Sequence, residues 1–123
     1  MNLQESGEMY LETILVLSQK KSDVRSIDIC DEMGFSKPSI SRAIHLLEDG
    51  GYLDIDNSGF ITLTDLGREI AEKIYERHKV LSAFFMAIGV SEETATEDAC
   101  RIEHVISDET FTAIKKHIKK HNI

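Results

Sequence analysis

Residues 36–53 read SKPSISRAIHLLEDGGYL, and this stretch decides the fold that the sequence predicts. Ser36 is a typical helix N-cap, and Pro38 falls in the first turn, where the missing N–H of proline is harmless. Four apolar residues at helical spacing form one face, namely Ile40, Ala43, Ile44 and Leu47. A Gly-Gly pair follows and ends the helix, which we expect over about residues 37–49.

Two helical segments are expected before this stretch. Apolar residues at helical spacing predict a first helix over about residues 5–19. Ser26 is a candidate N-cap for a short second helix that Gly34 ends. The inward face of this short helix is expected to hold Ile27, Cys30 and Met33. Short helix, tight turn and helix together have the order of a helix-turn-helix.

A β-hairpin and three helices are expected after the stretch. β-forming residues at 52–55 and 60–63 flank the turn-forming quartet DNSG, which predicts a hairpin with a longer loop. The three helices are expected at about residues 64–87, 92–106 and 108–120, each after a Thr or Ser N-cap. The inward face of the first of them is expected to hold Leu66, Ile70, Ile74, Leu81, Phe85 and Ile88.

This order of elements predicts a mainly α fold that begins with a winged helix-turn-helix. We expect a DNA-binding domain at residues 1–63 and a helical domain at residues 64–123. The helical half carries more apolar surface than a short chain easily covers, which favours a homodimer. This surface includes Phe84, Phe85, Met86 and Ile88. The alternative is that the last helix covers it within the same chain.

The outer face of helix 37–49 carries side chains that can read DNA. Arginine can pair with guanine in the major groove, and hydroxyl groups can meet base edges or phosphates. The hairpin loop has no Lys or Arg, so its contact with DNA should be slight. The residues predicted to bind double-stranded operator DNA are Arg25, Ser36, Lys37, Pro38, Ser39, Ser41, Arg42, His45, Asn57 and Ser58. The alternative is an ordinary amphipathic helix with a solvated outer face.

Charge and composition restrict the function classes. The 123 residues carry a net charge of −8, which argues mildly against nucleic acid because phosphates attract cations. The first third nevertheless holds a cluster of cations, namely Lys20, Lys21, Arg25, Lys37 and Arg42. Such a local basic face can bind DNA, and bound cations would reduce the repulsion from the rest of the chain.

Several features of the sequence exclude other classes. No apolar run is long enough to span a membrane and no secretory leader opens the chain, so we expect a cytoplasmic protein without a membrane partner. Cys30 and Cys100 are then expected to be reduced thiols. No phosphate loop, zinc-protease signature or nucleophile elbow occurs, so we expect neither an enzyme nor a small-molecule substrate.

Residues 100–104, CRIEH, form a candidate metal site. On a helix, Cys100, Glu103 and His104 would stand at i, i+3 and i+4 and share one face. A thiolate, a carboxylate and an imidazole suit a first-row transition metal. Met9 and Glu12 repeat the i, i+3 spacing near the N-terminus. The alternative is a surface Glu-His pair beside a core cysteine.

Five patterns occur in order over nearly the whole chain. They are EMYLETI at 8–14, SKPS at 36–39, ITLT at 61–64, RH at 77–78 and CRIEHVIS at 100–107. Together they resemble the diphtheria-toxin-repressor and manganese-transport-regulator family of metal-dependent transcriptional regulators. The resemblance implies a metal corepressor bound between the first helix, the long helix and the helix after it. It also implies a homodimer that represses metal-uptake genes by binding their operators.

The ligands that the resemblance implies come from both branches of the family. Those matching the iron-responsive branch are Met9, Cys100, Glu103 and His104, and those matching the manganese-responsive branch are Glu12 and His78. A second site of the iron branch has a Glu and a His where this chain has Ser82 and Thr96, so we expect that site to be lost. The SH3-like C-terminal domain of the iron branch is also expected to be absent.

Ligand softness favours Fe(II) over Mn(II), because Mn(II) prefers oxygen whereas thiolate and thioether donors suit later or softer ions. Co(II), Ni(II) or Zn(II) are expected to substitute in vitro. Two other functions stay open. One is a metal-independent winged-helix regulator that senses a small ligand. The other is a small metalloenzyme with an open coordination position, for which no separate general base is apparent.

Overall fold

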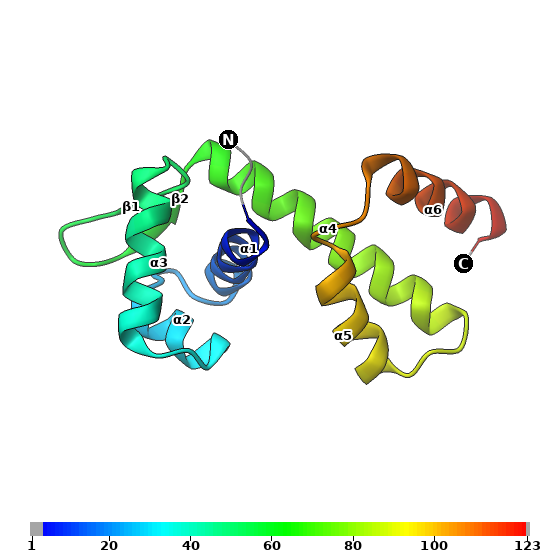
Figure 1. Cartoon of the computed structure of the whole chain (residues 1–123), viewed down its shortest axis with the longest axis horizontal. Coiled ribbons are helices and arrows are strands. Elements are labelled where there is room, and N and C mark those ends of the chain that lie inside the picture. Colours follow the sequence, from blue (N-terminus) through cyan, green and yellow to red (C-terminus); the bar gives the residue numbers. More distant parts are fainter. Residues whose placement is uncertain (1–3, 123) are drawn as a thin grey trace. The chain divides into compact units, whose positions relative to one another are not determined.

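The computed structural model describes residues 4–122. They fall into two compact units that are divided between Glu72 and Lys73. Within the described residues, six helices and one antiparallel two-stranded sheet occur in the order α1-α2-α3-β1-β2-α4-α5-α6 (Figure 1). The predicted mainly α fold is therefore confirmed. None of the helices in this part of the chain has the length and apolarity needed to cross a membrane.

The first unit is a winged helix-turn-helix. Its elements are α1 (Glu5–Lys20), α2 (Ser26–Met33), α3 (Lys37–Asp49), β1 (Leu53–Ile55) and β2 (Ile61–Leu63), followed by the start of α4. In the hairpin, Asp54 lies opposite Thr62. Each of the three helices and β1 contributes fully buried side chains to the core, among them Leu11, Ile14, Ile29, Ile40, Ile44 and Leu53.

The buried face of α2 differs from the predicted one. Ile29 is completely buried, whereas Ile27, which we expected to face inward, is 53% exposed. Cys30 and Met33 are only partly buried. Just before α2, Val24 forms a β-bridge with Ile61 of the hairpin. This pairing fixes the direction in which the chain enters α2, and the hydrophobic pattern of eight residues could not reveal it.

The start of α4 (Asp65–Ala87) is docked on the turn before β1. The backbone N–H of Thr64 donates to the carbonyl of Tyr52 at 3.2 Å, and the Thr64 hydroxyl donates to the carbonyl of Gly51 at 2.7 Å. A Cβ added to Gly67 would lie 1.9 Å from the carbonyl oxygen of Tyr52. Only glycine therefore allows the helix to approach the hairpin this closely.

The buried stripe of α4 differs from the predicted one near both ends of the helix. Leu66 and Ile88 were expected to face inward, but they are 48% and 62% exposed. The buried residues are Gly67, Ala71, Ile74, Arg77, Leu81 and Ser82. They keep helical spacing, but they include a glycine, an arginine and a serine, which a search for apolar periodicity does not select.

The second unit consists of the rest of α4 with α5 (Glu92–Ile102) and α6 (Asp108–His121). One hydrophobic cluster in its core contains a buried residue from each helix, namely Leu81, Ala99 and Phe111. As predicted, Ser91 and Ser107 are N-caps whose hydroxyl oxygens accept backbone N–H donors three residues later, at 3.3 and 3.1 Å.

Candidate metal centre and DNA-facing surface

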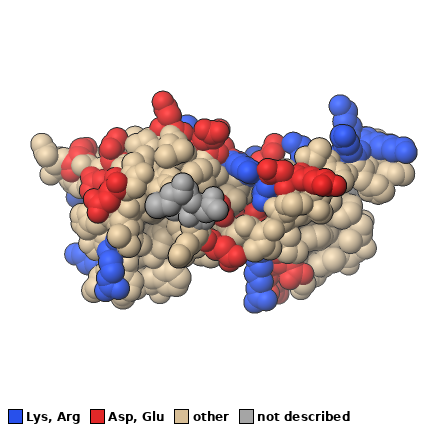
Figure 2. All heavy atoms as spheres, turned by 45° about the horizontal axis from the view of Figure 1, so that its top comes forward, with Lys and Arg blue, Asp and Glu red and all other residues tan. Residues whose placement is uncertain are grey.

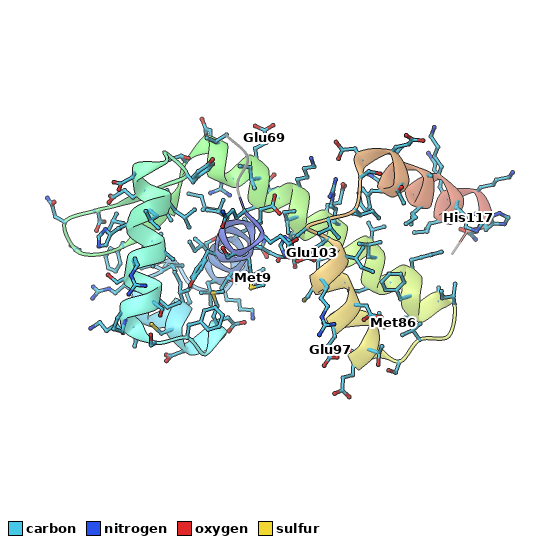
Figure 3. The ribbon with its side chains drawn as sticks, in the orientation of Figure 1. Met9, Glu69, Met86, Glu97, Glu103 and His117 are labelled. Carbon is cyan, nitrogen blue, oxygen red and sulfur yellow. The ribbon has the colours of Figure 1, made fainter. Side chains whose placement is uncertain are left out.

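Glu103 is the centre of a side-chain cluster in the second unit, at the end of α5 and beside α4 (Figure 3). Its carboxylate is 1% exposed, with Oε2 lying 3.0 Å from Nδ1 of His78 and Oε1 lying 3.4 Å from Nε2 of His104. The His104 side chain is itself 2% exposed. Because an unpaired carboxylate is costly to bury, the contact with His78 and the nearby imidazole of His104 offset part of this cost for Glu103.

Cys100 adds a sulfur to this cluster. Its Sγ lies 3.7 Å from Nδ1 of His78. One ligand atom each from His78, Cys100 and Glu103 lies within 4.8 Å of the other two. His78 comes from α4 and the other two from the end of α5, so the fold unites side chains 22 and 25 residues apart in the sequence.

This donor set fits a divalent transition metal. It offers imidazole nitrogen, thiol sulfur and carboxylate oxygen within a small volume, and neutral imidazole and thiolate are the forms that bind metals. Cys100 is exposed whereas Glu103 is buried.

The structure corrects the helical arrangement expected for CRIEH. Of the three candidate ligands in this segment, only Cys100 lies within α5, which ends at Ile102, about four residues earlier than predicted. Glu103 is the C-cap and His104 follows in a turn. The candidate ligands therefore converge from a helix end and a turn, together with His78 of α4, rather than from one helix face.

Met9 and Glu12 lie on α1 in the first unit. Met9 is 38% exposed and Glu12 is partly buried. The hydroxyl of Thr13 donates to the carbonyl of Met9 at 2.9 Å, a bond within the helix. The predicted role of these two side chains as metal ligands stays a prediction.

The outer face of α3 is open to solvent. The predicted apolar face of α3 is confirmed, since Ile40, Ile44 and Leu47 are buried and Ala43 is partly buried. The N-cap is Ser36, whose hydroxyl oxygen accepts the N–H of Ser39 at 3.4 Å. Of the residues predicted to contact DNA on this helix, Lys37, Pro38, Ser39, Arg42 and His45 are exposed and Ser41 is partly buried. The helix thus presents an amino end and an outer face to a partner.

The hairpin loop is ordered by one carboxylate. Oδ1 of Asp56 accepts the backbone N–H groups of Ser58 and Phe60, both at 2.9 Å. Gly59 has a φ of +85°, a conformation that favours glycine. Asn57 and Ser58 are exposed at the tip. They are therefore accessible, but they offer amide and hydroxyl groups and no cation.

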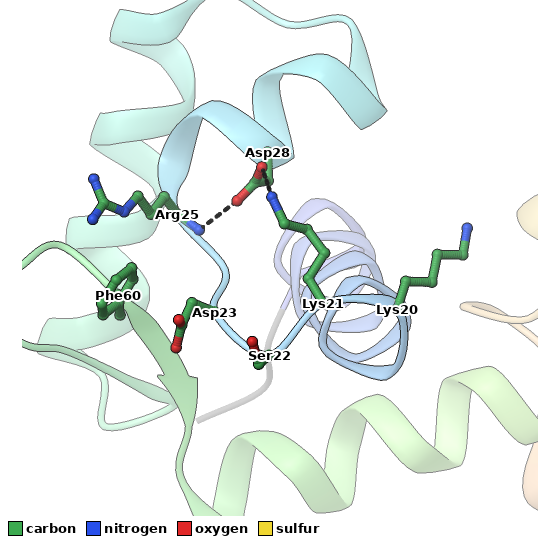
Figure 4. Close-up of a pocket in the computed structure, with 7 residues that line it drawn as sticks. All are labelled: Lys20, Lys21, Ser22, Asp23, Arg25, Asp28 and Phe60. Atoms are coloured by element: carbon green, nitrogen blue, oxygen red, sulfur yellow. Dashed lines mark hydrogen bonds and ion pairs between the residues drawn. The ribbon is translucent and has the colours of Figure 1, made fainter.

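An open pocket of about 560 Å³ lies where α1 ends and α2 begins (Figure 4). Its lining residues are Lys20, Lys21, Ser22, Asp23, Arg25, Asp28 and Phe60. The N-cap of α2 is Arg25 rather than the predicted Ser26. The Arg25 N–H donates to Oδ2 of Asp28 at 2.8 Å, and the ammonium of Lys21 donates to Oδ1 at 2.6 Å.

The charges in this pocket are arranged around Arg25. Hydrogen bonds from Lys21 and from the Arg25 backbone hold the pKa of Asp28 below its ordinary value. The Arg25 guanidinium lies 4.4 Å from the ring centroid of Phe60, a cation–π contact. Arg25 therefore has a defined position at the N-terminus of α2, the end of a helix that attracts anions.

Acidic side chains are widespread on the surface. On the face shown in Figure 2, Asp and Glu side chains are spread broadly while Lys and Arg occur in separate groups. The five cations of the first third, Lys20, Lys21, Arg25, Lys37 and Arg42, are all exposed. With a net charge of −8, the chain repels phosphate overall and attracts it only locally.

Known families match both halves of the chain. The iron dependent repressor N-terminal DNA binding domain matches residues 2–60, and the iron dependent repressor metal binding and dimerisation domain matches residues 64–122. The chain is 30% identical over 112 residues to the transcriptional regulator MntR of Escherichia coli O6:H1, covering 91% of this chain and 72% of MntR. It is also 30% identical over 120 residues to an uncharacterized HTH-type transcriptional regulator of Methanocaldococcus jannaschii, covering 96% of each.

Solved structures share the fold. A manganese-dependent transcriptional repressor in complex with manganese superposes with a TM-score of 0.84 at 26% identity, over 92% of this chain and 52% of that one. The manganese regulator SloR gives a TM-score of 0.82 at 24% identity, over 97% of this chain and 55% of that one. The chain thus spans about half the length of these solved proteins.

The relatives are transcriptional regulators and not enzymes. The resemblance seen in the five sequence patterns is confirmed by matches over residues 2–60 and 64–122. The chain belongs to the iron dependent repressor family, that is, the diphtheria-toxin-repressor and manganese-transport-regulator family of metal-dependent transcriptional repressors.

Proposed function

We propose that this protein is a DNA-binding transcriptional regulator that responds to a divalent metal and represses metal-uptake genes as a homodimer. The observation that carries the proposal is the buried Glu103 carboxylate between His78 and His104, with the Cys100 thiol beside it. The matches to a DNA-binding domain and to a metal-binding and dimerisation domain support the two parts of the function.

The residues proposed to hold the metal in the second unit are His78, Cys100, Glu103 and His104. A bound divalent ion would supply positive charge that offsets the carboxylate and the thiolate and reduces the repulsion between an acidic chain and DNA. We also propose Met9 and Glu12 as ligands, on the family resemblance alone. Changing each to Ala and measuring metal affinity tests this part separately.

Fe(II) is the metal that we propose first and Mn(II) second. Cys100 supplies a thiolate, which suits Fe(II) better than the oxygen-preferring Mn(II), and Met9 would add a thioether. Mn(II) stays second because it is the ion named for two of the solved relatives. Co(II), Ni(II) and Zn(II) are expected to bind as substitutes in vitro.

Exchanging soft for oxygen ligands should change the metal preference. In a variant with Met9→Asp and Cys100→Glu, we expect the ratio of Mn(II) to Fe(II) affinity to rise by about tenfold or more, since both changes replace sulfur by oxygen. Anaerobic competition titrations with a chelator measure both affinities. An unchanged ratio would contradict the assignment of these two residues as ligands.

We propose that α3 reads base edges in the major groove while Arg25 meets a phosphate from the N-terminus of α2. Lys21 already forms an ion pair with Asp28. Arg25, which stacks on the ring of Phe60, is therefore the cation of that pocket better placed to bind a phosphate. In a homodimer, two α3 helices would enter successive major grooves about 34 Å apart.

Two substitutions on α3 should have different effects on DNA binding. Arg42→Ala is expected to cost about 1–3 kcal/mol of binding free energy and to relax the sequence preference, since arginine pairs with guanine. Lys37→Ala should weaken binding equally for all sequences and reduce the salt dependence, as loss of a phosphate contact does. If Arg42→Ala lost the same binding free energy for cognate and for scrambled DNA, this role of Arg42 would be contradicted.

The direct test of the proposed function is metal-dependent DNA binding. Fluorescence anisotropy of DNA from upstream of the protein's own gene is measured with Fe(II) under anaerobic conditions, with Mn(II) and with chelator. We expect tight binding only with metal, and tighter binding with Fe(II). Equal binding with chelator would favour a metal-independent regulator instead.

A further inference from the structure

Arg77 is a buried cation whose side chain is 6% exposed. Its Nη1 donates to the carbonyl oxygens of Glu103 at 3.1 Å and of Ile106 at 2.7 Å. Its Nη2 donates to Oδ1 of Asp108 at 2.5 Å. One guanidinium on α4 therefore binds two carbonyl groups of the turn that joins α5 to α6. It also binds the side chain of the first residue of α6.

Besides Arg77, backbone hydrogen bonds and the packing of Ile102 and Ile106 against the hydrophobic cluster hold the turn between α5 and α6. α5 ends at Ile102, and α6 begins at Asp108. The last carbonyl groups of a helix and those of the following turn lack intrahelical donors. Two short backbone bonds within the turn come from Val105 and Ile106 to Ile102. Arg77 supplies the donors for two carbonyls that these bonds do not use.

Two neighbouring residues of α4 contact Glu103. Arg77 binds its backbone carbonyl, and the next residue, His78, contacts its carboxylate at 3.0 Å. A side chain fixed at both its backbone and its tip has little rotational freedom. The turn also carries His104, the other imidazole beside the Glu103 carboxylate. Arg77 thus holds the backbone of two candidate ligands without being a ligand itself.

The guanidinium is itself held in place. The ammonium of Lys73, 3.2 Å from Asp108, and the guanidinium of Arg77 hold the pKa of the Asp108 carboxyl below its ordinary value. Asp108 is therefore ionised at neutral pH and pairs with Arg77 at the start of α6. Arg77 also lies 5.6 Å from the ring centroid of Phe111.

We propose that Arg77 is a positioning residue for the metal site, which presets the α5–α6 turn so that Glu103 and His104 are in place before a metal binds. The inference rests on the proposed metal-binding function. Ligands that are ordered in advance lose less conformational freedom on binding, so the metal binds more tightly. Cys100 lies within α5 and does not depend on this turn.

The test compares the full-length chain with Arg77→Lys and Arg77→Met. Lysine keeps the charge but lacks the planar fork that binds both carbonyls, and methionine removes the charge as well. The matched control is Glu76→Gln, which removes the neighbouring α4–α6 ion pair to Lys115, at 3.3 Å, but leaves the turn untouched. Co(II) is the probe, titrated in competition with a chelator under anaerobic conditions.

We expect both Arg77 variants to bind Co(II) about 10–100-fold more weakly than the parent protein, as loss of a residue that orients ligands does. The control should bind within about threefold. The thiolate-to-cobalt charge-transfer absorption should persist at saturating Co(II), because Cys100 remains available. Amide hydrogen exchange at Ile106 should be faster in the metal-free Arg77 variants. The Ile106 N–H donates to the carbonyl of Ile102, so its exchange rate measures how often the turn opens.

The outcomes separate the inference from the proposed function. If Arg77→Met does not fold, Arg77→Lys decides the matter. Folded Arg77→Lys with parental Co(II) affinity, or with weaker affinity but unchanged exchange at Ile106, overturns the inference alone. An equal loss of affinity in Glu76→Gln also overturns it, since α4–α6 packing would then explain the effect. A parent protein that binds no Co(II) overturns both proposals.

Discussion

Glu103→Gln is expected to abolish the metal-dependent gain in DNA affinity. The two oxygens of Glu103 lie 3.0 Å from His78 and 3.4 Å from His104, so this one carboxylate joins both imidazoles. Glutamine has the same shape but is a poor metal ligand. Even residues that only orient a ligand cost about 10–100-fold in metal affinity, so we expect a loss of at least about 100-fold here.

The same substitution should have only a modest effect on folding of the metal-free protein. Glutamine keeps the size of glutamate and can still hydrogen-bond to His78, so the buried side chain keeps a polar partner. Because a hydrogen bond to a charged group is exchanged for one to a neutral amide, we expect a loss of about 1–2 kcal/mol. Thermal unfolding with and without metal measures both effects, since ligand binding to the folded state raises the unfolding temperature.

A matched control for this prediction is Glu97→Gln on the same helix. Glu97 is exposed, and Figure 3 shows it on α5. It has the same chemistry as Glu103 but lies outside the cluster, so metal response should be unchanged. Retention of the full metal-dependent gain in DNA affinity by Glu103→Gln would contradict the assignment of Glu103 as a metal ligand.

Gly67→Ala is expected to destabilise the first unit by about 3 kcal/mol or more, the upper range for overpacking of a close contact. The new Cβ would lie 1.9 Å from the carbonyl oxygen and 2.9 Å from the carbonyl carbon of Tyr52. Both atoms are backbone and cannot move aside as a flexible side chain can. The helix or the hairpin must shift, which breaks the Thr64 bonds to this turn.

The sign of this effect distinguishes two explanations. Helix propensity alone predicts that Gly→Ala inside a helix stabilises by about 1 kcal/mol, whereas the contact with Tyr52 predicts a loss. Urea unfolding followed by circular dichroism gives the free energy, and Glu69→Ala on the exposed side of α4 is the control, with an expected change within about 0.5 kcal/mol. A stabilised Gly67→Ala variant would contradict the close docking of α4.

Local signals explain why the helix-turn-helix could be predicted from the sequence. The Ser36 cap and the spacing of Ile40, Ile44 and Leu47 act within a few residues, and the structure has them as expected. The serine caps of α5 and α6 are equally local. Each of these features needs only the neighbouring residues, so the chain specifies them without tertiary information.

The features that sequence patterns missed depend on contacts between distant elements. Leu66 is apolar but exposed, because Gly67 is the residue that docks on Tyr52. The early end of α5 is accompanied by the bonds from Arg77 on α4 to the turn. Periodicity cannot place an arginine in a buried stripe, since it weighs apolar residues alone. The proximity of His78 to Glu103 was implied by the family resemblance and not by spacing.

The central claim is that metal binding and DNA binding favour each other in this protein. Thermodynamic linkage requires that if metal raises DNA affinity by some factor, DNA raises metal affinity by the same factor. The most direct test is a chelator-competition titration with Fe(II) under anaerobic conditions, with and without saturating operator DNA. We predict that the operator tightens metal binding by the same factor by which metal tightens operator binding. Identical metal affinity with and without operator would contradict the claim.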